Sequence, residues 1–142
     1  MKLGRNFFLI LLLTTGFNFL YFIKTKAVSD KPLFITITSD CCSTCKKLKP
    51  VIEELEYLYY GKIEFVTLNI STKETLEISK EKAIELGISD FFNKNKINLP
   101  TVGIFCSTNN KESKIFAGET RREIYESLLD NILNNSSHLC SL

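Results

Sequence analysis

The chain has 142 residues, which is enough for one domain with a hydrophobic core and too few for two. Of its 18 basic residues, four precede residue 28, where there is no acidic residue. The rest of the chain therefore has 14 basic against 16 acidic residues, a net charge of −2. A mildly acidic domain has no electrostatic basis for binding nucleic acid, so we predict no nucleic-acid partner.

The N-terminal segment is predicted to direct export. Lys2 and Arg5 precede an uncharged apolar run from Phe7 to Ile23, and Lys24 and Lys26 close it. The run is near the lower limit for a spanning helix and is longer than most signal-peptide cores.

We favour an uncleaved signal anchor, which residues 1–27 form and which residues 7–23 hold in the membrane. Thr25-Lys26-Ala27 is a poor cleavage site because a lysine lies between its two small residues. A cleaved signal peptide and a buried core helix are the alternatives. With either form of export, the predicted domain over residues 28–142 is extracytoplasmic, in a periplasmic, secretory or lumenal compartment, where disulfides persist.

A strand followed by a cysteine pair is the most informative pattern in the domain. Leu33 to Thr38 is an apolar, β-branched run that predicts a strand. Cys42-Ser43-Thr44-Cys45 follows where a helix is expected to begin. Two cysteines at this spacing and in this place indicate thiol–disulfide chemistry or a metal site.

The helix start suggests different roles for the two cysteines. Unpaired N–H groups and the helix dipole favour a thiolate at Cys42, which is therefore the predicted nucleophile. Cys45 lies one turn further along and is predicted to be shielded and to resolve the mixed disulfide. A static structural disulfide is the alternative.

The segments that follow alternate between helix and strand. Apolar spacing predicts a helix from the motif to about Leu58, with Pro50 inside it and Gly61 as its C′ residue. Residues 63–70 read as a strand that is apolar enough to be central. A second helix is expected over residues 72–86, with its apolar members at Leu76, Ile78, Ala83, Ile84 and Leu86.

The last third predicts a hairpin and a covering helix. Residues 101–106 and 114–117 are short β-like runs around a polar turn, which favours an antiparallel pair. Gly118 ends the second run, and residues 119–133 form an amphipathic pattern. The order β-α-β-α-β-β-α predicts an α/β fold with three layers.

This pattern resembles the thioredoxin family over about residues 32–133. Four landmarks occur in the expected order: Cys42-Ser43-Thr44-Cys45-Lys46 with Pro50, Val66 to Ile70, Leu99-Pro100-Thr101, and Ala117-Gly118. The resemblance implies a thioredoxin fold, an α/β/α sandwich around a central mixed sheet. It also implies a redox-active Cys42–Cys45 disulfide, no cofactor and no metal.

The same resemblance implies how clients bind. Pro100 is expected to be cis and to face the cysteines, and backbone groups of Leu99 are expected to hold an extended client strand. Leu99, Pro100 and Thr101 are thus the predicted substrate-binding residues, with Thr101 packing and not catalysing. The partners implied are client proteins with thiols or disulfides and an upstream redox partner. Ser43-Thr44 predicts a reduction potential between those of strong reductants and strong oxidants.

Three departures from the family pattern stand out. Cys41 replaces the tryptophan that usually precedes the first cysteine. Thr36 and Thr67 replace a buried aspartate and a nearby lysine, and the aspartate is thought to help deprotonate the second cysteine. Residues 89–98 form an insertion, whose Phe91, Phe92 and Ile97 are expected to cover the core, with a docking face as the alternative.

The other cysteines leave a second function open. Cys41 and Cys45 have a spacing that exported thioredoxin-like copper carriers use with a distant histidine, and His138 is the one histidine here. Cys106 is expected to be a small buried hydrophobe, and Cys140 a free or intermolecular thiol, with a Cys41–Cys140 bridge also open. We therefore predict a protein-disulfide oxidoreductase, with a copper or zinc carrier or a non-catalytic docking subunit as alternatives.

Overall fold

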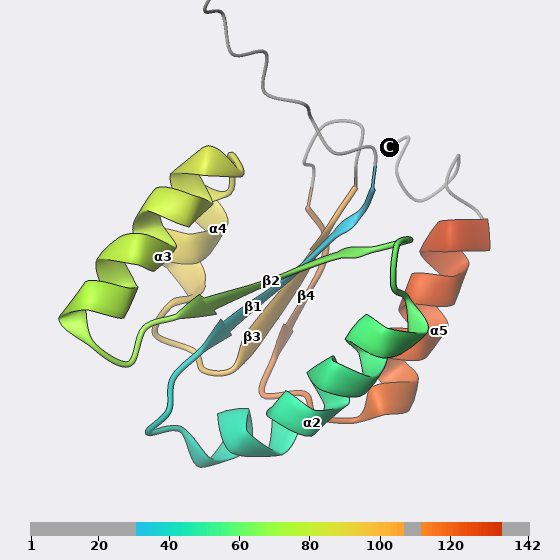
Figure 1. Cartoon of the computed structure of the whole chain (residues 1–142), viewed down its shortest axis with the longest axis horizontal. Coiled ribbons are helices and arrows are strands. Elements are labelled where there is room, and N and C mark those ends of the chain that lie inside the picture. The colour runs from blue at the N-terminus through green and yellow to red at the C-terminus, as the bar shows by residue number, and fades with distance from the viewer. Residues whose placement is uncertain (1–30, 107–111, 135–142) are drawn as a thin grey trace, which may run out of the picture.

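The structure is a computed structural model that describes residues 31–106 and 112–134. The predicted anchor lies outside these residues, as does most of the turn at 107–113. The four described strands form one sheet in the order β2-β1-β3-β4 (Figure 1). They are β1 (Leu33–Thr38), β2 (Glu64–Asn69), β3 (Thr101–Phe105) and β4 (Glu112–Ala117). β1 and β2 are parallel, whereas β3 runs antiparallel to both β1 and β4, which confirms the predicted hairpin.

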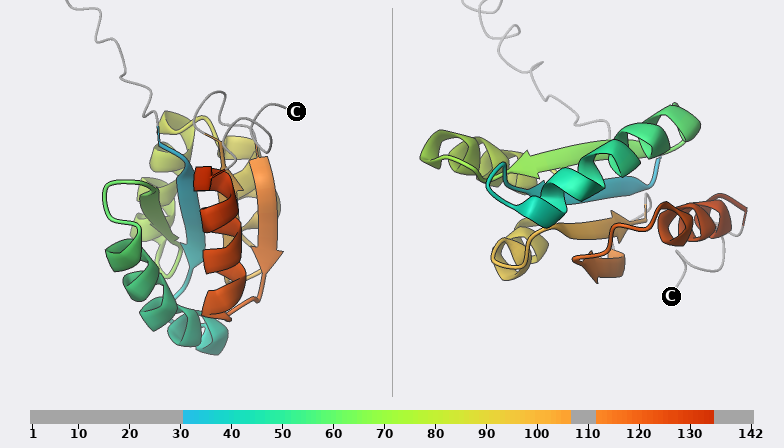
Figure 2. Two further views of the ribbon diagram at one scale, coloured as in Figure 1. Left: turned by 90° about the vertical axis from the view of Figure 1, so that its right-hand side faces the viewer. Right: turned by 90° about the horizontal axis from the view of Figure 1, so that it is seen from below.

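Helices cover both faces of the sheet, so the predicted three-layer α/β/α arrangement is confirmed. α2 (Ser43–Leu58) and α5 (Arg122–Asn134) lie on one face, which the left view of Figure 2 looks onto. α3 (Lys73–Glu85) and α4 (Ser89–Asn95) lie on the other (Figure 1). Successive β1 side chains alternate between the two cores: Phe34 packs with α2 and α5, and Ile35 with α3 and α4.

Residues 63–70 are predicted to be apolar enough for a central strand. Among the four described strands, however, β2 lies at one edge. Side chains from both faces of β2 still reach the two cores: the Phe65 and Phe34 ring centroids lie 4.9 Å apart, and Leu68 is buried with Ala83 of α3, whereas Thr67 is exposed. The apolar residues of β2 therefore reflect contacts with both cores and do not by themselves fix the number of neighbouring strands.

The inserted segment covers the core, as predicted. Residues 89–95 form the short helix α4, which the sequence pattern did not reveal. Phe91 and Phe92 are 4% and 1% exposed in the core under α3 and α4, whereas Ile97 is 80% exposed. A Cβ at Gly103 of β3 would lie 2.6 Å from the Phe91 ring, so the close packing of α4 requires glycine there.

Several helix ends differ from the predicted ones. α2 runs through Pro50 but ends at Leu58 with Tyr59 as its cap, so Gly61, at φ +75°, lies in the following turn and is not the C′ residue. Two of the predicted apolar members of α3 point to solvent, namely Ile78 and Ile84.

The last helix begins at Arg122, three residues later than expected. The Glu119 carboxylate accepts hydrogen bonds from the side chain and the backbone of Arg121. These hydrogen bonds lower the pKa of Glu119 to about 2.

Candidate active site

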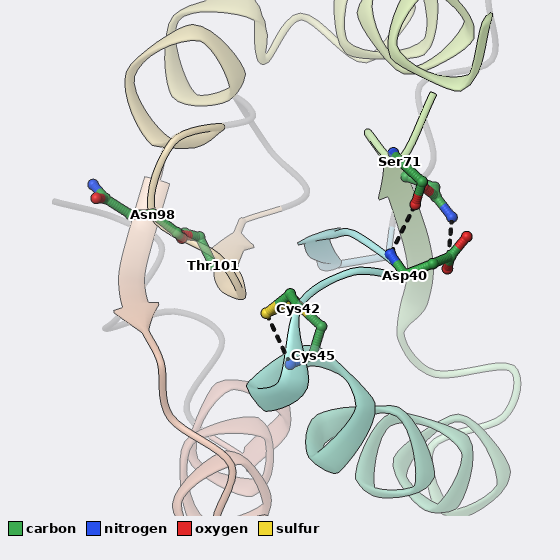
Figure 3. The surroundings of a disulfide bond; sticks show 7 residues. Asp40, Cys42, Cys45, Ser71, Asn98 and Thr101 are labelled. Carbon is green, nitrogen blue, oxygen red and sulfur yellow. Dashed lines mark hydrogen bonds between the residues drawn. A yellow bond between two sulfur atoms is a disulfide. The ribbon is translucent and has the colours of Figure 1, made fainter. Parts of the chain in front are cut away.

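Cys42 is placed at the start of α2 by the change from strand to helix. Its backbone is still extended, and its Sγ accepts a hydrogen bond from the backbone N–H of Cys45 at 3.1 Å, which makes it the N-cap of the helix. The two sulfur atoms lie within disulfide bonding distance, and the Cα atoms are 5.1 Å apart (Figure 3). The predicted position of the pair at the helix N-terminus is thus confirmed.

The two cysteine residues differ in their exposure to solvent. Cys42 is half-buried, whereas Cys45 is 4% exposed. The first turn of α2 contains no acidic residue that would oppose a thiolate. When the disulfide opens, the N–H of Cys45 and the positive end of the helix dipole therefore both stabilise negative charge on the Cys42 sulfur.

A polar contact between two loops holds the segment in front of the cysteines. The backbone N–H of Asp40 donates to Ser71 Oγ at 2.8 Å (Figure 3). Ser71 Oγ in turn donates to Asn69 Oδ1. Asp40 and Ser71 follow the carboxyl ends of β1 and β2, which lie side by side because the strands are parallel. The loop that leads to Cys42 is thus tied to the next loop of the sheet.

Loss of the Ser71 hydroxyl is expected to loosen this loop. In Ser71→Ala the N–H of Asp40 loses its acceptor, and we expect the free energy of unfolding to fall by about 1 kcal/mol, as measured by urea denaturation. Ser71→Thr keeps the hydroxyl and serves as the control. An equal loss in both variants would show that the hydrogen bond to Asp40 does not matter.

The segment before β3 has the backbone form that the resemblance implies. The Leu99–Pro100 peptide bond is cis. Thr101 is fully buried, and its hydroxyl donates to the carbonyl of Asn98, so this side chain packs inside the protein. In the view of Figure 3, Cys42 lies between the Asn98–Thr101 segment and Asp40. The binding of clients by Leu99, Pro100 and Thr101 stays a prediction.

The remaining cysteines have different environments. Cys41 is exposed and free. Cys106 is buried as expected, but its sulfur is disulfide-bonded, so it is more than a small apolar side chain. Cys140 and His138 lie outside the described residues.

Within residues 31–106 and 112–134, no three histidine, cysteine or acidic side chains come together in a way that could hold a metal ion. No helix in the same ranges is long and apolar enough to cross a membrane.

The sequence reasoning missed the two polar residues that brace the active loop, Asn69 and Ser71. The only signal was the presence of polar residues after the ends of two strands predicted to be parallel. It also missed a cavity of about 500 Å³ that reaches Cys45 and lies against the threonines Thr36 and Thr67.

Comparison with known proteins points to one family. The family model described as thioredoxin matches residues 11–130. The thioredoxins of Rickettsia felis and Rickettsia conorii are 28% and 27% identical to the chain over 94 residues, which is 66% of this chain and 76% of each relative. The thioredoxin of Rickettsia bellii is 28% identical over 87 residues, 61% of this chain and 70% of that protein.

Proposed function

Because the chain belongs to the thioredoxin family of thiol–disulfide oxidoreductases, we propose that it exchanges disulfides with client proteins through Cys42 and Cys45. One observation carries this proposal. A half-buried cysteine at a helix N-terminus lies at disulfide distance from a buried one, which is the arrangement that an attacking and a resolving thiol require.

In the reducing direction, the Cys42 thiolate attacks a client disulfide. A bond forms between Cys42 and one client sulfur, and the other client sulfur leaves as a thiolate. Cys45 then attacks the Cys42 sulfur, which closes the Cys42–Cys45 disulfide and releases the second client thiol. Two electrons pass from the cysteine pair to the client, and an upstream redox partner returns them. The same steps in reverse oxidise a client.

We place the client beside the segment Leu99-Pro100-Thr101. This segment leads directly into β3, and the N–H of Gly118 binds the carbonyl of Pro100 at 2.8 Å, which fixes its backbone. An extended client chain that bonds to Leu99 would therefore meet a rigid edge next to Cys42.

The proposed compartment is extracytoplasmic, with residues 7–23 as a membrane anchor. The charge pattern of residues 1–27 supports it. The disulfide at Cys106 also supports it, because structural disulfides are rare in reducing compartments.

The first test is the equilibrium reduction potential of the Cys42–Cys45 pair. We expect a value between about −250 and about −200 mV, because Ser43-Thr44 has neither the sequence typical of strong reductants nor the histidine of strong oxidants. The full chain would be equilibrated with a glutathione series, and its free thiols would be alkylated and counted by mass. Cys41→Ser is the control that removes the exposed neighbour.

The measured potential decides the direction of electron flow and tests the proposed function. A potential well below this window would make the protein a reductant that needs a donor, and one well above it an oxidant or isomerase. If no Cys42–Cys45 disulfide exchanges with glutathione, the proposed function is wrong. Metal retention that is lost in Cys41→Ser would then favour a carrier.

A further inference from the structure

A cavity of about 500 Å³ lies behind the cysteine pair, between α2 and the edge of the sheet. Its helix wall includes Cys45, Leu48 and Ile52, and its sheet wall includes Thr36 and Thr67. Cys45 is thus buried from bulk solvent but faces a space in the protein that is large enough for several water molecules.

The two threonines of the sheet wall are direct neighbours. Thr36 of β1 and Thr67 of β2 are partners in the parallel register, so their side chains lie on the same face of the sheet. Thr36 is 4% exposed, whereas Thr67 is exposed to solvent. Both threonines line the same cavity as Cys45, one buried and one at the surface.

This arrangement bears on a difficulty in the resolving step. Cys45 must lose its proton before it attacks, and burial raises the pKa of a thiol. The sheet wall offers no carboxylate, since its members are threonines, Ser39 and Asn69 apart from the rim residue Asp40. The charged groups that line the cavity are all exposed at its rim, namely Asp40, Lys46, Lys49, Glu53 and Glu56.

We propose that water held in this cavity by the hydroxyls of Thr36 and Thr67 accepts the proton of Cys45. This inference rests on the proposed function. The Cys45 thiol gives its proton to water, and its thiolate attacks Cys42 in the mixed disulfide. The Cys42–Cys45 bond forms, the bond from Cys42 to the client sulfur breaks, and the client leaves as a thiolate. Thr36 and Thr67 act as positioning residues, because they hold the water that accepts the proton and do not themselves react with either sulfur.

The test follows both chemical steps in one trace. Reduced full-length protein carrying Cys41→Ser is mixed with 5,5′-dithiobis(2-nitrobenzoate), and the trace of the same protein with Cys42→Ser and Cys45→Ser added, which reports Cys106 and Cys140 alone, is subtracted. Attack by Cys42 releases one coloured thiolate, and resolution by Cys45 releases a second. The rate of each phase is measured as a function of pH. The pH dependence of the first phase then reports the pKa of Cys42, and that of the second phase reports the pKa of Cys45.

Thr36→Val/Thr67→Val keeps the shape of the cavity wall and removes both hydroxyls. We expect the first phase to stay within about twofold of the parent, and urea denaturation shows whether the variant is folded. The second phase should slow by about tenfold at neutral pH, with its midpoint moved up by about one pH unit. Thr36→Ser/Thr67→Ser keeps both hydroxyls and should behave as the parent does.

Three results would overturn the inference. The rate of the second phase could be unchanged in Thr36→Val/Thr67→Val (the valine pair), or it could be slowed equally in Thr36→Ser/Thr67→Ser (the serine pair). The rate of the second phase could also fall in Asp40→Asn, Glu53→Gln or Glu56→Gln while it is unaffected in the valine pair. That result would make the carboxylate in question the acceptor of the Cys45 proton. A parent protein with no first phase at all would instead overturn the proposed function, and this inference with it.

Discussion

Cys45→Ser is expected to trap client proteins on Cys42 as stable mixed disulfides, and Cys42→Ser to abolish disulfide exchange. Cys42 is the N-cap of α2 and the more exposed of the two cysteines, so a client is expected to reach it first. Serine at that position has no accessible thiolate, so the rate of insulin reduction should fall on the order of 10³-fold or more. Without Cys45 the mixed disulfide has no resolving thiol and persists.

Trapped complexes would be detected as bands on a non-reducing gel that disappear with dithiothreitol. Cys41→Ser is the matched control: the residue is adjacent to Cys42, exposed and free, yet it lies outside the proposed mechanism. If Cys41→Ser loses as much activity as Cys42→Ser, the assignment of the nucleophile is wrong. Trapping by Cys42→Ser in place of Cys45→Ser would exchange the two roles.

The elements closest to the cysteines were predictable because their signals are local. A β-branched run, a cysteine pair and an amphipathic pattern indicate β1 and α2 without knowledge of the rest of the chain. The place of the pair at the helix N-terminus follows from that junction, and the cis form of Pro100 came from the resemblance alone.

What was missed depends on contacts between distant segments. The edge position of β2 among the four described strands is decided by which strands pair, whereas its apolar side chains reflect only their contacts with the two cores. The bond from Asp40 to Ser71 spans 31 residues, and the cavity at Cys45 exists only once α2 lies over β1 and β2. The disulfide at Cys106 likewise has no signature in its neighbouring residues.

The inserted helix α4 offers the second large effect, this time on stability. Phe92 is 1% exposed and packs in the core between the sheet and α3, so Phe92→Ala leaves a cavity that the surrounding helices cannot close. We expect the free energy of unfolding to fall by about 3–5 kcal/mol, which is a large part of the about 5–15 kcal/mol typical of a domain. Urea denaturation of the reduced and oxidised proteins would measure it.

Ile97 provides the matched control, because it belongs to the same insertion but is 80% exposed. Ile97→Ala should change stability by no more than about 0.5 kcal/mol and leave insulin reduction unchanged. This pair of variants separates the two interpretations of the insertion. If Phe92→Ala is as stable as the parent while Ile97→Ala impairs exchange with a protein client, the segment is a docking face. A stability loss confined to Phe92→Ala means that this family member uses the insertion to complete its core, so that the face of the sheet away from α2 is closed by α3 and α4 together.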